Sequence, residues 1–263
     1  MTDDRLLLVG CGNMGRAILD AWLAGSLAGI EITVVDPVLA EAPRGVRLLP
    51  QVPAGERFSA VVLAVKPQLL DAVAPQVAGA ADGALLLSIL AGVPLARLEA
   101  TFRGATPVRF MANLAAAFGA SPVAAFAGSL PPQATALAGR LLNPLGPLTW
   151  LAAEEQLHAV TALAGSGPGF VYRFLDALSR GGVELGLDPA AAAQMALAMV
   201  AGAAELAARS PDAFATLAAK VASKGGTTEA GMAVLDADRA LDRLIAGTLT
   251  AACGRSRELA GEG

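Results

Sequence analysis

Cysteine, histidine and aromatic residues are scarce in this chain of 263 residues. It contains two cysteines, Cys11 and Cys253, and a single histidine, His158. The two cysteines lie at opposite ends of the chain, and one histidine cannot build a metal site alone, so we expect no bound metal. Such sparse cysteine also argues against a disulfide framework, and a reducing cytoplasm is the expected compartment.

Charge is also limited, and no cluster of basic residues is present. Charged residues make up 16% of the chain, the net charge is -4, and the 19 basic residues are scattered. Proteins that bind nucleic acid usually carry a basic stripe or patch, so we do not expect nucleic acid as a partner. Apolar residues reach 55%, which excludes a disordered chain and allows one large or two modest domains.

No segment has the pattern of a membrane span or a secretory signal. Residues 190–208 are weakly polar but consist mostly of alanine, and they include Gln194 and Glu205. Alanine is too weakly hydrophobic to make this stretch a convincing span. The chain starts Thr2-Asp3-Asp4, which is acidic where a signal peptide is basic. We therefore expect no membrane partner.

Short apolar runs alternate with helical stretches up to about residue 152. Strands are expected at 5–10, 31–36, 60–65, 84–88, 108–111 and 123–127, with a last edge strand at 148–151. This alternation predicts an α/β fold, a Rossmann-type parallel sheet, over residues 1–152. Residues 153–263 show only helical patterns, at 154–164, 168–185, 189–209, 211–222 and 228–260, the last with a possible break. Their many small apolar residues indicate a helical domain that packs against a second subunit.

The clearest motif is the glycine loop Gly10-Cys11-Gly12-Asn13-Met14-Gly15. It follows a buried strand, opens a helix and precedes a second strand, which is the context of a dinucleotide site. The first glycine permits a tight turn, the second lets a pyrophosphate approach, and the third lets the helix pack on the strand. The helix N-terminus offers free N–H groups to the phosphates. An ordinary strand–helix turn with incidental glycines is the alternative.

Asp36 ends the second strand of this unit. A carboxylate at that position accepts hydrogen bonds from a ribose 2′-OH and repels a 2′-phosphate, so it favours NADH. A solvent-exposed turn residue before Pro37 is the alternative. Arg44 and Arg47 are near enough in the sequence to approach a phosphate, so NADPH stays open as the cofactor.

Two further segments have residue patterns typical of ligand-binding sites. Ala64-Val65-Lys66-Pro67 ends a strand, where ligands bind in open α/β sheets, although Lys66 could equally start a helix in solvent. Ser223-Lys224-Gly225-Gly226-Thr227-Thr228 lies between two helical stretches. Its glycines can turn N–H groups into one concavity beside two hydroxyls, which suits a carboxylate. A plain helix–helix turn with a threonine N-cap is the alternative.

The ordered set of motifs resembles the pyrroline-5-carboxylate reductases, which make proline by reducing a cyclic imine. The matching segments are 10–15, 64–68, 88–92, 109–113, 165–168, 186–187 and 225–228. The resemblance implies an N-terminal Rossmann domain that binds NADPH or NADH and a C-terminal helical domain that forms a homodimer. It places 1-pyrroline-5-carboxylate between the nicotinamide and the Gly-Gly-Thr-Thr segment.

The resemblance also implies roles for individual residues. Ser223, Gly225, Gly226, Thr227 and Thr228 would hold the substrate, and Thr228 could donate a proton. Asn113 and Lys66 would line the nicotinamide. Cofactor binding would use the glycine loop (Gly10, Gly12, Asn13, Met14, Gly15), Asp36, the strand end (Ala64, Val65, Lys66, Pro67) and Asn113.

The chain departs from the family pattern at three places. The usual Arg-x-Met-Pro-Asn-Thr-Pro is here Arg109-Phe110-Met111-Ala112-Asn113-Leu114-Ala115, and Lys224 replaces the proline of Ser-Pro-Gly-Gly-Thr-Thr. Residues 46–60 also lack the asparagine-bearing segment that commonly helps to bind the adenosine ribose or its phosphate. These departures leave cofactor choice and substrate affinity open.

Three alternatives remain. One is a reductase of a related cyclic imine. Another is a β-hydroxyacid dehydrogenase-like enzyme, but Arg173 stands where that class has a catalytic lysine, and an arginine stays protonated and cannot act as a base. The third is a nucleotide-binding sensor without enzymatic activity, which the altered 109–115 segment motivates.

Overall fold

The computed structural model describes residues 4–25, 27, 30–41, 43 and 45–261. The chain forms two compact units, one of residues 1–166 with 252–263 and one of residues 167–251. The first unit extends past the predicted boundary at 152 because helix α5 (Gln156–Val160) contacts strands β6 and β7 of the sheet. Assignment of cofactor binding to 1–152 and of dimerisation to 153–263 stays a prediction.

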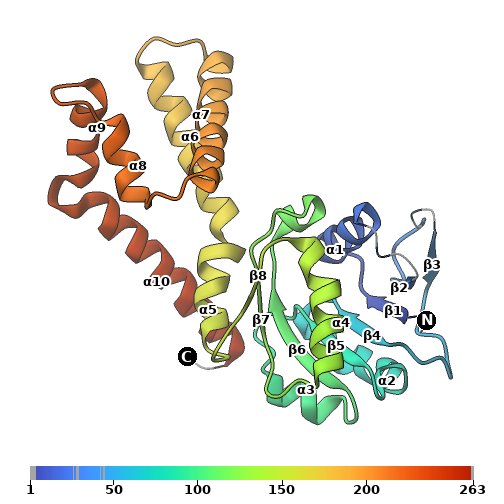
Figure 1. Cartoon of the computed structure of the whole chain (residues 1–263). Coiled ribbons are helices and arrows are strands. Elements are labelled where there is room, and N and C mark those ends of the chain that lie inside the picture. Colours follow the sequence, from blue (N-terminus) through green and yellow to red (C-terminus); the bar gives the residue numbers. More distant parts are fainter. Residues whose placement is uncertain (1–3, 26, 28–29, 42, 44, 262–263) are drawn as a thin grey trace. The chain divides into compact units, whose positions relative to one another are not determined.

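An eight-stranded sheet forms the centre of the first unit (Figure 1). The strands are β1 (Asp4–Val9), β2 (Ile30–Val35), β3 (Val46–Leu49), β4 (Ala60–Leu63), β5 (Leu85–Ser88), β6 (Thr106–Met111), β7 (Val123–Phe126) and β8 (Leu148–Trp150). Their order is β3-β2-β1-β4-β5-β6-β7-β8, and β6 with β7 is the one antiparallel pair between the described strands. The predicted Rossmann-type sheet is confirmed. Strand β3 was not predicted, because Arg47 interrupts its short apolar run.

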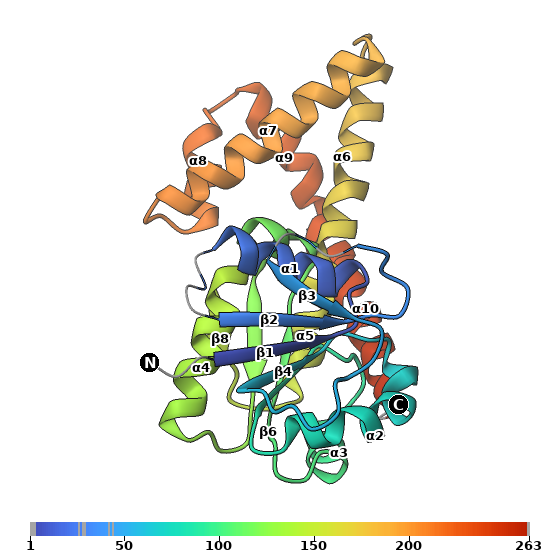
Figure 2. The same cartoon turned by 90° about the vertical axis from the view of Figure 1, so that its right-hand side faces the viewer.

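Helices cover both faces of this sheet. Helices α1 (Asn13–Ala24) and α4 (Pro132–Leu142) pack on the face that holds Leu6 and Leu8. Helices α2 (Leu70–Ala81) and α3 (Leu95–Thr101) pack on the face that holds Leu7 and Val9, and Figure 2 shows α1 and α2 on opposite sides. Burial on both faces explains why the strands read as continuous apolar runs. Short 3-10 helices complete the unit: Pro67–Leu69, Leu114–Phe118 and Asn143–Leu145.

One buried hydroxyl in this core has no hydrogen-bond partner. The Oγ1 of Thr33, in β2, is fully buried and unpaired within the part of the chain that the structure describes. Because an unsatisfied buried hydroxyl is destabilising, we expect Thr33→Val to raise the Tm by about 3 °C. Thr33→Ser keeps the hydroxyl, loses a methyl group and should melt below the wild type. Thermal unfolding followed by circular dichroism checks both, and a valine variant that melts no higher than the wild type would contradict the prediction.

The second unit is helical, as predicted. It consists of α6 (Gly167–Glu184), α7 (Pro189–Arg209), α8 (Phe214–Val221), α9 (Thr227–Asp236) and most of α10 (Ala240–Ala260). The possible break in the helical stretch over 228–260 lies at Ala237–Arg239, where Asp238 and Arg239 have positive φ. Asp188 starts α7 by accepting hydrogen bonds from the N–H groups of residues 190 and 191.

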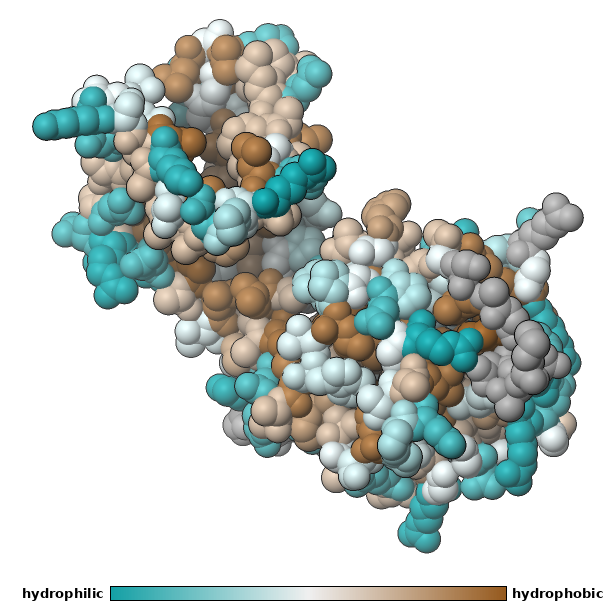
Figure 3. All heavy atoms as spheres, viewed as in Figure 1, coloured by the Kyte–Doolittle hydropathy of each residue, from teal (hydrophilic) through white to brown (hydrophobic). Residues whose placement is uncertain are grey.

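The helices of this unit expose many large apolar side chains (Figure 3). They include Tyr172, Phe174, Met195, Leu197, Met199, Leu206 and Phe214. Helix α7 is long and apolar enough to cross a membrane by length and composition alone. So much exposed apolar surface is unusual for a monomer and is typical of surfaces that interact with another protein or a membrane.

Candidate active site

The glycine loop joins β1 to α1, and each glycine has a distinct geometry. Gly10 has a φ of +90°, and a Cβ at this residue would lie 2.8 Å from the carbonyl oxygen of Ala64. A Cβ at Gly15 would clash with the carbonyl oxygen of Gly10, so α1 can approach the loop only with glycine here. A Cβ at Gly12 would meet no atom within 4 Å. This open space next to Gly12 lies at the N-terminus of α1, where no side chain caps the free N–H groups. Such a position suits a pyrophosphate.

A cavity of about 680 Å³ opens beside this loop, at the carboxyl ends of β1, β2 and β4. Its size is within the range of small-molecule and cofactor sites. Six of the predicted cofactor residues line it: Gly10, Gly12, Asp36, Ala64, Val65 and Lys66. The other predicted residues do not: Asn13, Met14 and Gly15 begin α1, Pro67 begins a 3-10 helix, and Asn113 follows β6.

Part of the cavity wall carries no sequence motif. Residues 50–52 follow the unpredicted strand β3, so no motif marked them. Leu69, Val73 and Gln76 also line the cavity. Their spacing of four and three positions places them on one face of a helix, a signal that could have identified this wall.

Asp36 lies at the cavity wall and holds the glycine loop. Its Oδ2 accepts a hydrogen bond from the Cys11 N–H at 2.7 Å, and its Oδ1 accepts from the N–H groups of Val38 and Leu39 at 2.9 and 3.2 Å. Burial alone would raise the pKa of this carboxyl, but the three N–H groups outweigh burial and lower the pKa. Asp36 is therefore a carboxylate at neutral pH. Since a carboxylate has about four acceptor positions, it can also accept from a ribose hydroxyl.

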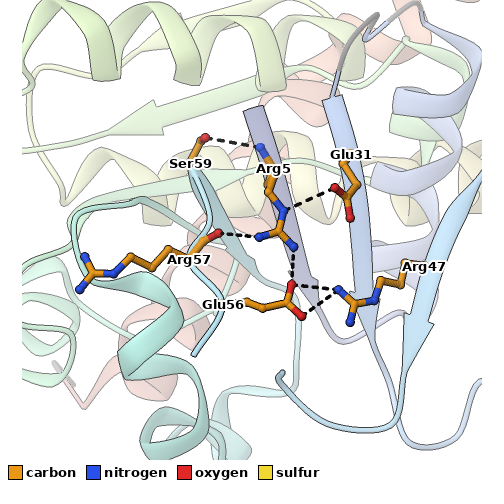
Figure 4. A network of polar contacts seen from close by, with 6 residues as sticks. All are labelled: Arg5, Glu31, Arg47, Glu56, Arg57 and Ser59. Carbon is orange, nitrogen blue, oxygen red and sulfur yellow. Dashed lines mark hydrogen bonds and ion pairs between the residues drawn. The ribbon is translucent and has the colours of Figure 1, made fainter. Parts of the chain in front are cut away.

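Arg47 lies away from the cavity, which corrects the expectation that it could meet a 2′-phosphate there. Its Nη1 contacts the two carboxylate oxygens of Glu56 at 3.0 and 2.9 Å. Glu56 also pairs with Arg5, and these side chains gather at the amino-terminal ends of the strands (Figure 4). Hydrogen bonds from Arg47 and Arg5 lower the pKa of Glu56. Arg44 lies outside the described residues.

Asn113 is buried at the carboxyl end of β6. Its Nδ2 donates to the carbonyl of Ala164 at 2.9 Å, and its Oδ1 accepts from the Ala115 N–H at 2.9 Å. The contact to Ala115 caps the 3-10 helix that follows. The predicted place of Asn113 beside the nicotinamide stays a prediction, because the side chain does not line the cavity.

The predicted substrate segment lies in the second unit, just before α9. Gly225 has a φ of +73°, and its N–H donates to the Glu229 carboxylate at 2.6 Å. Helix α9 is capped by Gly226 without a side-chain hydrogen bond, so the alternative of a threonine N-cap does not hold. Thr227 and Thr228 are exposed in the first turn of α9. Their hydroxyl groups are accessible to a ligand.

The parallel sheet, the glycine loop and the cavity with its carboxylate define the dinucleotide-binding class of oxidoreductases. The model of the family "Pyrroline-5-carboxylate reductase dimerisation" matches residues 154–259, and "NADP oxidoreductase coenzyme F420-dependent" matches residues 5–92. The pyrroline-5-carboxylate reductase of Synechocystis sp. is 37% identical over 97% of this chain and 98% of that protein. The Pseudomonas aeruginosa enzyme is 35% identical over 99% and 98%.

Solved structures agree with these relatives. A pyrroline-5-carboxylate reductase from Coxiella burnetii has a TM-score of 0.90 and 28% identity over 98% of this chain and 99% of that chain. The Plasmodium falciparum pyrroline carboxylate reductase, solved with NADP bound, shares the fold with a TM-score of 0.85 and 21% identity over 99% of both chains. The chain belongs to the pyrroline-5-carboxylate reductase family.

Proposed function

We propose that this protein reduces 1-pyrroline-5-carboxylate to L-proline. The observation that carries the proposal is the relation to reductases of this name over nearly the whole chain. A bound dihydronicotinamide supplies the hydride, which adds to C5 of the imine. A protonated imine is the better acceptor, so the protein mainly has to position the reactants and recognise the carboxylate.

The residues of the glycine loop and of the cavity beside it fit a nicotinamide dinucleotide. The open space at Gly12 and the free N–H groups at the start of α1 suit a pyrophosphate. Gly10, Gly15, Asn13 and Met14 shape that turn. Asp36 would hold the adenosine ribose, and Lys66 stands at the cavity wall. Both NADH and NADPH are proposed as cofactors. Asp36 favours NADH, whereas the family model that matches residues 5–92 is named for NADP and the Plasmodium falciparum structure was solved with NADP bound.

We assign substrate recognition to the segment before α9. Ser223 and the Gly225 to Thr228 stretch would hold the carboxylate or the ring. Thr228 would stabilise the ring nitrogen or donate its proton. In this scheme Lys66, at the cavity wall, acts on the nicotinamide side.

We further propose that the protein is a homo-oligomer built from dimers. The matched dimerisation region covers the helices that expose apolar side chains. A second copy of the chain is the occupant that this match supports for α7 and its neighbours. A cytoplasmic enzyme without membrane or nucleic-acid partners stays a prediction.

The decisive experiment is a steady-state assay with purified protein. NADH or NADPH should be oxidised only when 1-pyrroline-5-carboxylate is supplied, and L-proline should form. Turnover with neither cofactor would reject the proposal, and cofactor binding without turnover would favour a sensor. If the protein reduced only related cyclic imines, the substrate would be one of these imines and not 1-pyrroline-5-carboxylate. The dehydrogenase alternative is disfavoured because Arg173 is a cation paired with Asp176 at 2.6 Å.

Thr228 gives a direct test of the substrate segment. We expect Thr228→Val to lower kcat about 10- to 100-fold, because it removes a hydroxyl that acts on the reacting ring. Its exposure in the first turn of α9 means that the fold should be unaffected. Thr228→Ser keeps the hydroxyl and should retain most activity. Equal activity of the valine and serine variants would remove Thr228 from the mechanism.

A further inference from the structure

A π-helical turn connects α5 to α6, and its backbone hydrogen bonds are irregular. The turn spans Thr161–Gly165, and the N–H of Ser166 donates to the carbonyl of Thr161 at 2.8 Å, five residues back. The Thr161 hydroxyl donates to the carbonyl of Leu157 at 2.7 Å. Turns of this kind are rare and frequently occur at functional sites.

The carbonyl of Ala164, inside this turn, lacks its regular helical donor. In an α-helix, the carbonyl of residue 164 would accept from the N–H of residue 168. Residue 168 is a proline, which has no N–H. Ala164 is half-buried, so its carbonyl is left for a side-chain donor or for water.

Asn113 provides that donor. Its Nδ2 lies 2.9 Å from the Ala164 oxygen, and the residue is 8% exposed. The turn also packs closely on the end of β6, because a Cβ at Gly165 would lie 3.2 Å from the Met111 Sδ. Two segments far apart in the sequence, 111–113 and 164–165, are thus joined by one hydrogen bond and one close contact between a side chain and the backbone.

We propose that Asn113 is a positioning residue that supplies the hydrogen bond which Pro168 withholds from the Ala164 carbonyl. The side chain holds the π turn at the carboxyl end of β6, the edge of the sheet at which the cofactor cavity opens. Asn113 thereby acts on catalysis by fixing the backbone of this turn at Ala164, instead of touching the cofactor. The catalytic part of this inference rests on the proposed reductase activity; the contact itself does not.

A double-mutant cycle tests the contact without any substrate. Asn113→Ser keeps an N-cap oxygen for the Ala115 N–H but is too short to reach Ala164. We expect it to lower the Tm by about 3 °C. In a Pro168→Ala background, residue 168 has an N–H for the same carbonyl, so the loss caused by Asn113→Ser should be clearly smaller. Equal losses in both backgrounds would overturn the proposal.

Kinetics separate positioning from direct contact. Asn113→Ser should lower kcat about tenfold, leave the Kd for NADH unchanged in a fluorescence titration, and cost less kcat in the Pro168→Ala background. A weakened Kd with equal effects in both backgrounds would show that Asn113 contacts the cofactor, against the proposal. If the wild type reduces no imine, the Tm cycle still decides the contact while the proposed function fails.

A second variant covers the case in which Pro168→Ala does not fold. Asn113→Asp caps Ala115 as well as serine does, but it turns a carboxylate oxygen toward the Ala164 carbonyl. It should therefore melt below Asn113→Ser. An aspartate variant that is as stable as the serine variant would overturn the proposed hydrogen bond.

Discussion

Replacing Asp36 by serine should shift the ratio of kcat/KM for NADPH over NADH toward NADPH by about 100-fold. The Asp36 carboxylate lies at the cavity wall and is ionised at neutral pH, since three backbone N–H groups lower its pKa. A fixed like charge beside a 2′-phosphate costs several kcal/mol, and about 2.7 kcal/mol corresponds to a factor of about 100. Steady-state kinetics with both cofactors give the ratio.

Two further variants separate charge from shape at this position. Asp36→Asn removes the charge but keeps an oxygen for the backbone N–H groups, so it should also shift the ratio toward NADPH. Glu41→Ser removes one negative charge from an exposed residue of the same loop that does not line the cavity, and should leave the ratio unchanged. An unaltered ratio in both Asp36 variants would show that this carboxylate does not select the cofactor.

The same carboxylate links stability to pH. The pKa of Asp36 is lower in the folded chain than in the unfolded chain, where the three N–H groups are absent. Its contribution to stability is therefore complete above the unfolded pKa and is lost as the pH falls through the folded pKa. Discrimination against NADPH should persist at every pH above the folded pKa of Asp36, because it requires the ionised carboxylate.

Gly12→Ala should weaken cofactor binding by about 30-fold while leaving the Tm close to that of the wild type. A Cβ at this position meets no protein atom within 4 Å, so the free protein should tolerate it. The methyl group instead enters the space assigned to the pyrophosphate, and such overpacking costs about 2 kcal/mol. Titration of NADH fluorescence and a thermal melt on the same sample measure the two effects.

Gly15→Ala is the matched comparison, because it adds the same methyl group at a position where the methyl meets the protein backbone instead of a ligand. Its Cβ would clash with the Gly10 carbonyl oxygen, so α1 must shift and the Tm should fall markedly even without cofactor. If Gly12→Ala bound NADH like the wild type, the glycine loop would not be the pyrophosphate site.

Much of the fold could be predicted from local patterns. The buried strands are apolar on both faces, and the glycine loop lies between the first strand and its helix, so pattern and context agree there. Strand β3 was missed because it is a short edge strand with an arginine in its second position. The cavity wall after β3 was missed for the same reason.

Side-chain partners were beyond the reach of sequence patterns. No local pattern distinguishes Arg47 from a phosphate ligand. In the folded chain Arg47 pairs with Glu56 at the amino-terminal ends of the strands, away from the cavity. The place of Asn113 beside the nicotinamide stays a prediction, and no local pattern shows that its amide bonds to Ala164 and Ala115. Such contacts join residues distant in the sequence, and only the packed chain decides them.

By itself, the sequence determined the class of fold, the glycine loop and the family, because these depend on local geometry and on the order of motifs along the chain. The tertiary structure decided which charges reach the cavity and which are neutralised elsewhere. It also decided that Asn113 supports a turn in which a proline removes the regular donor. The physical reason is that hydrogen bonds and ion pairs act over about 3 Å, and only folding brings distant residues that close.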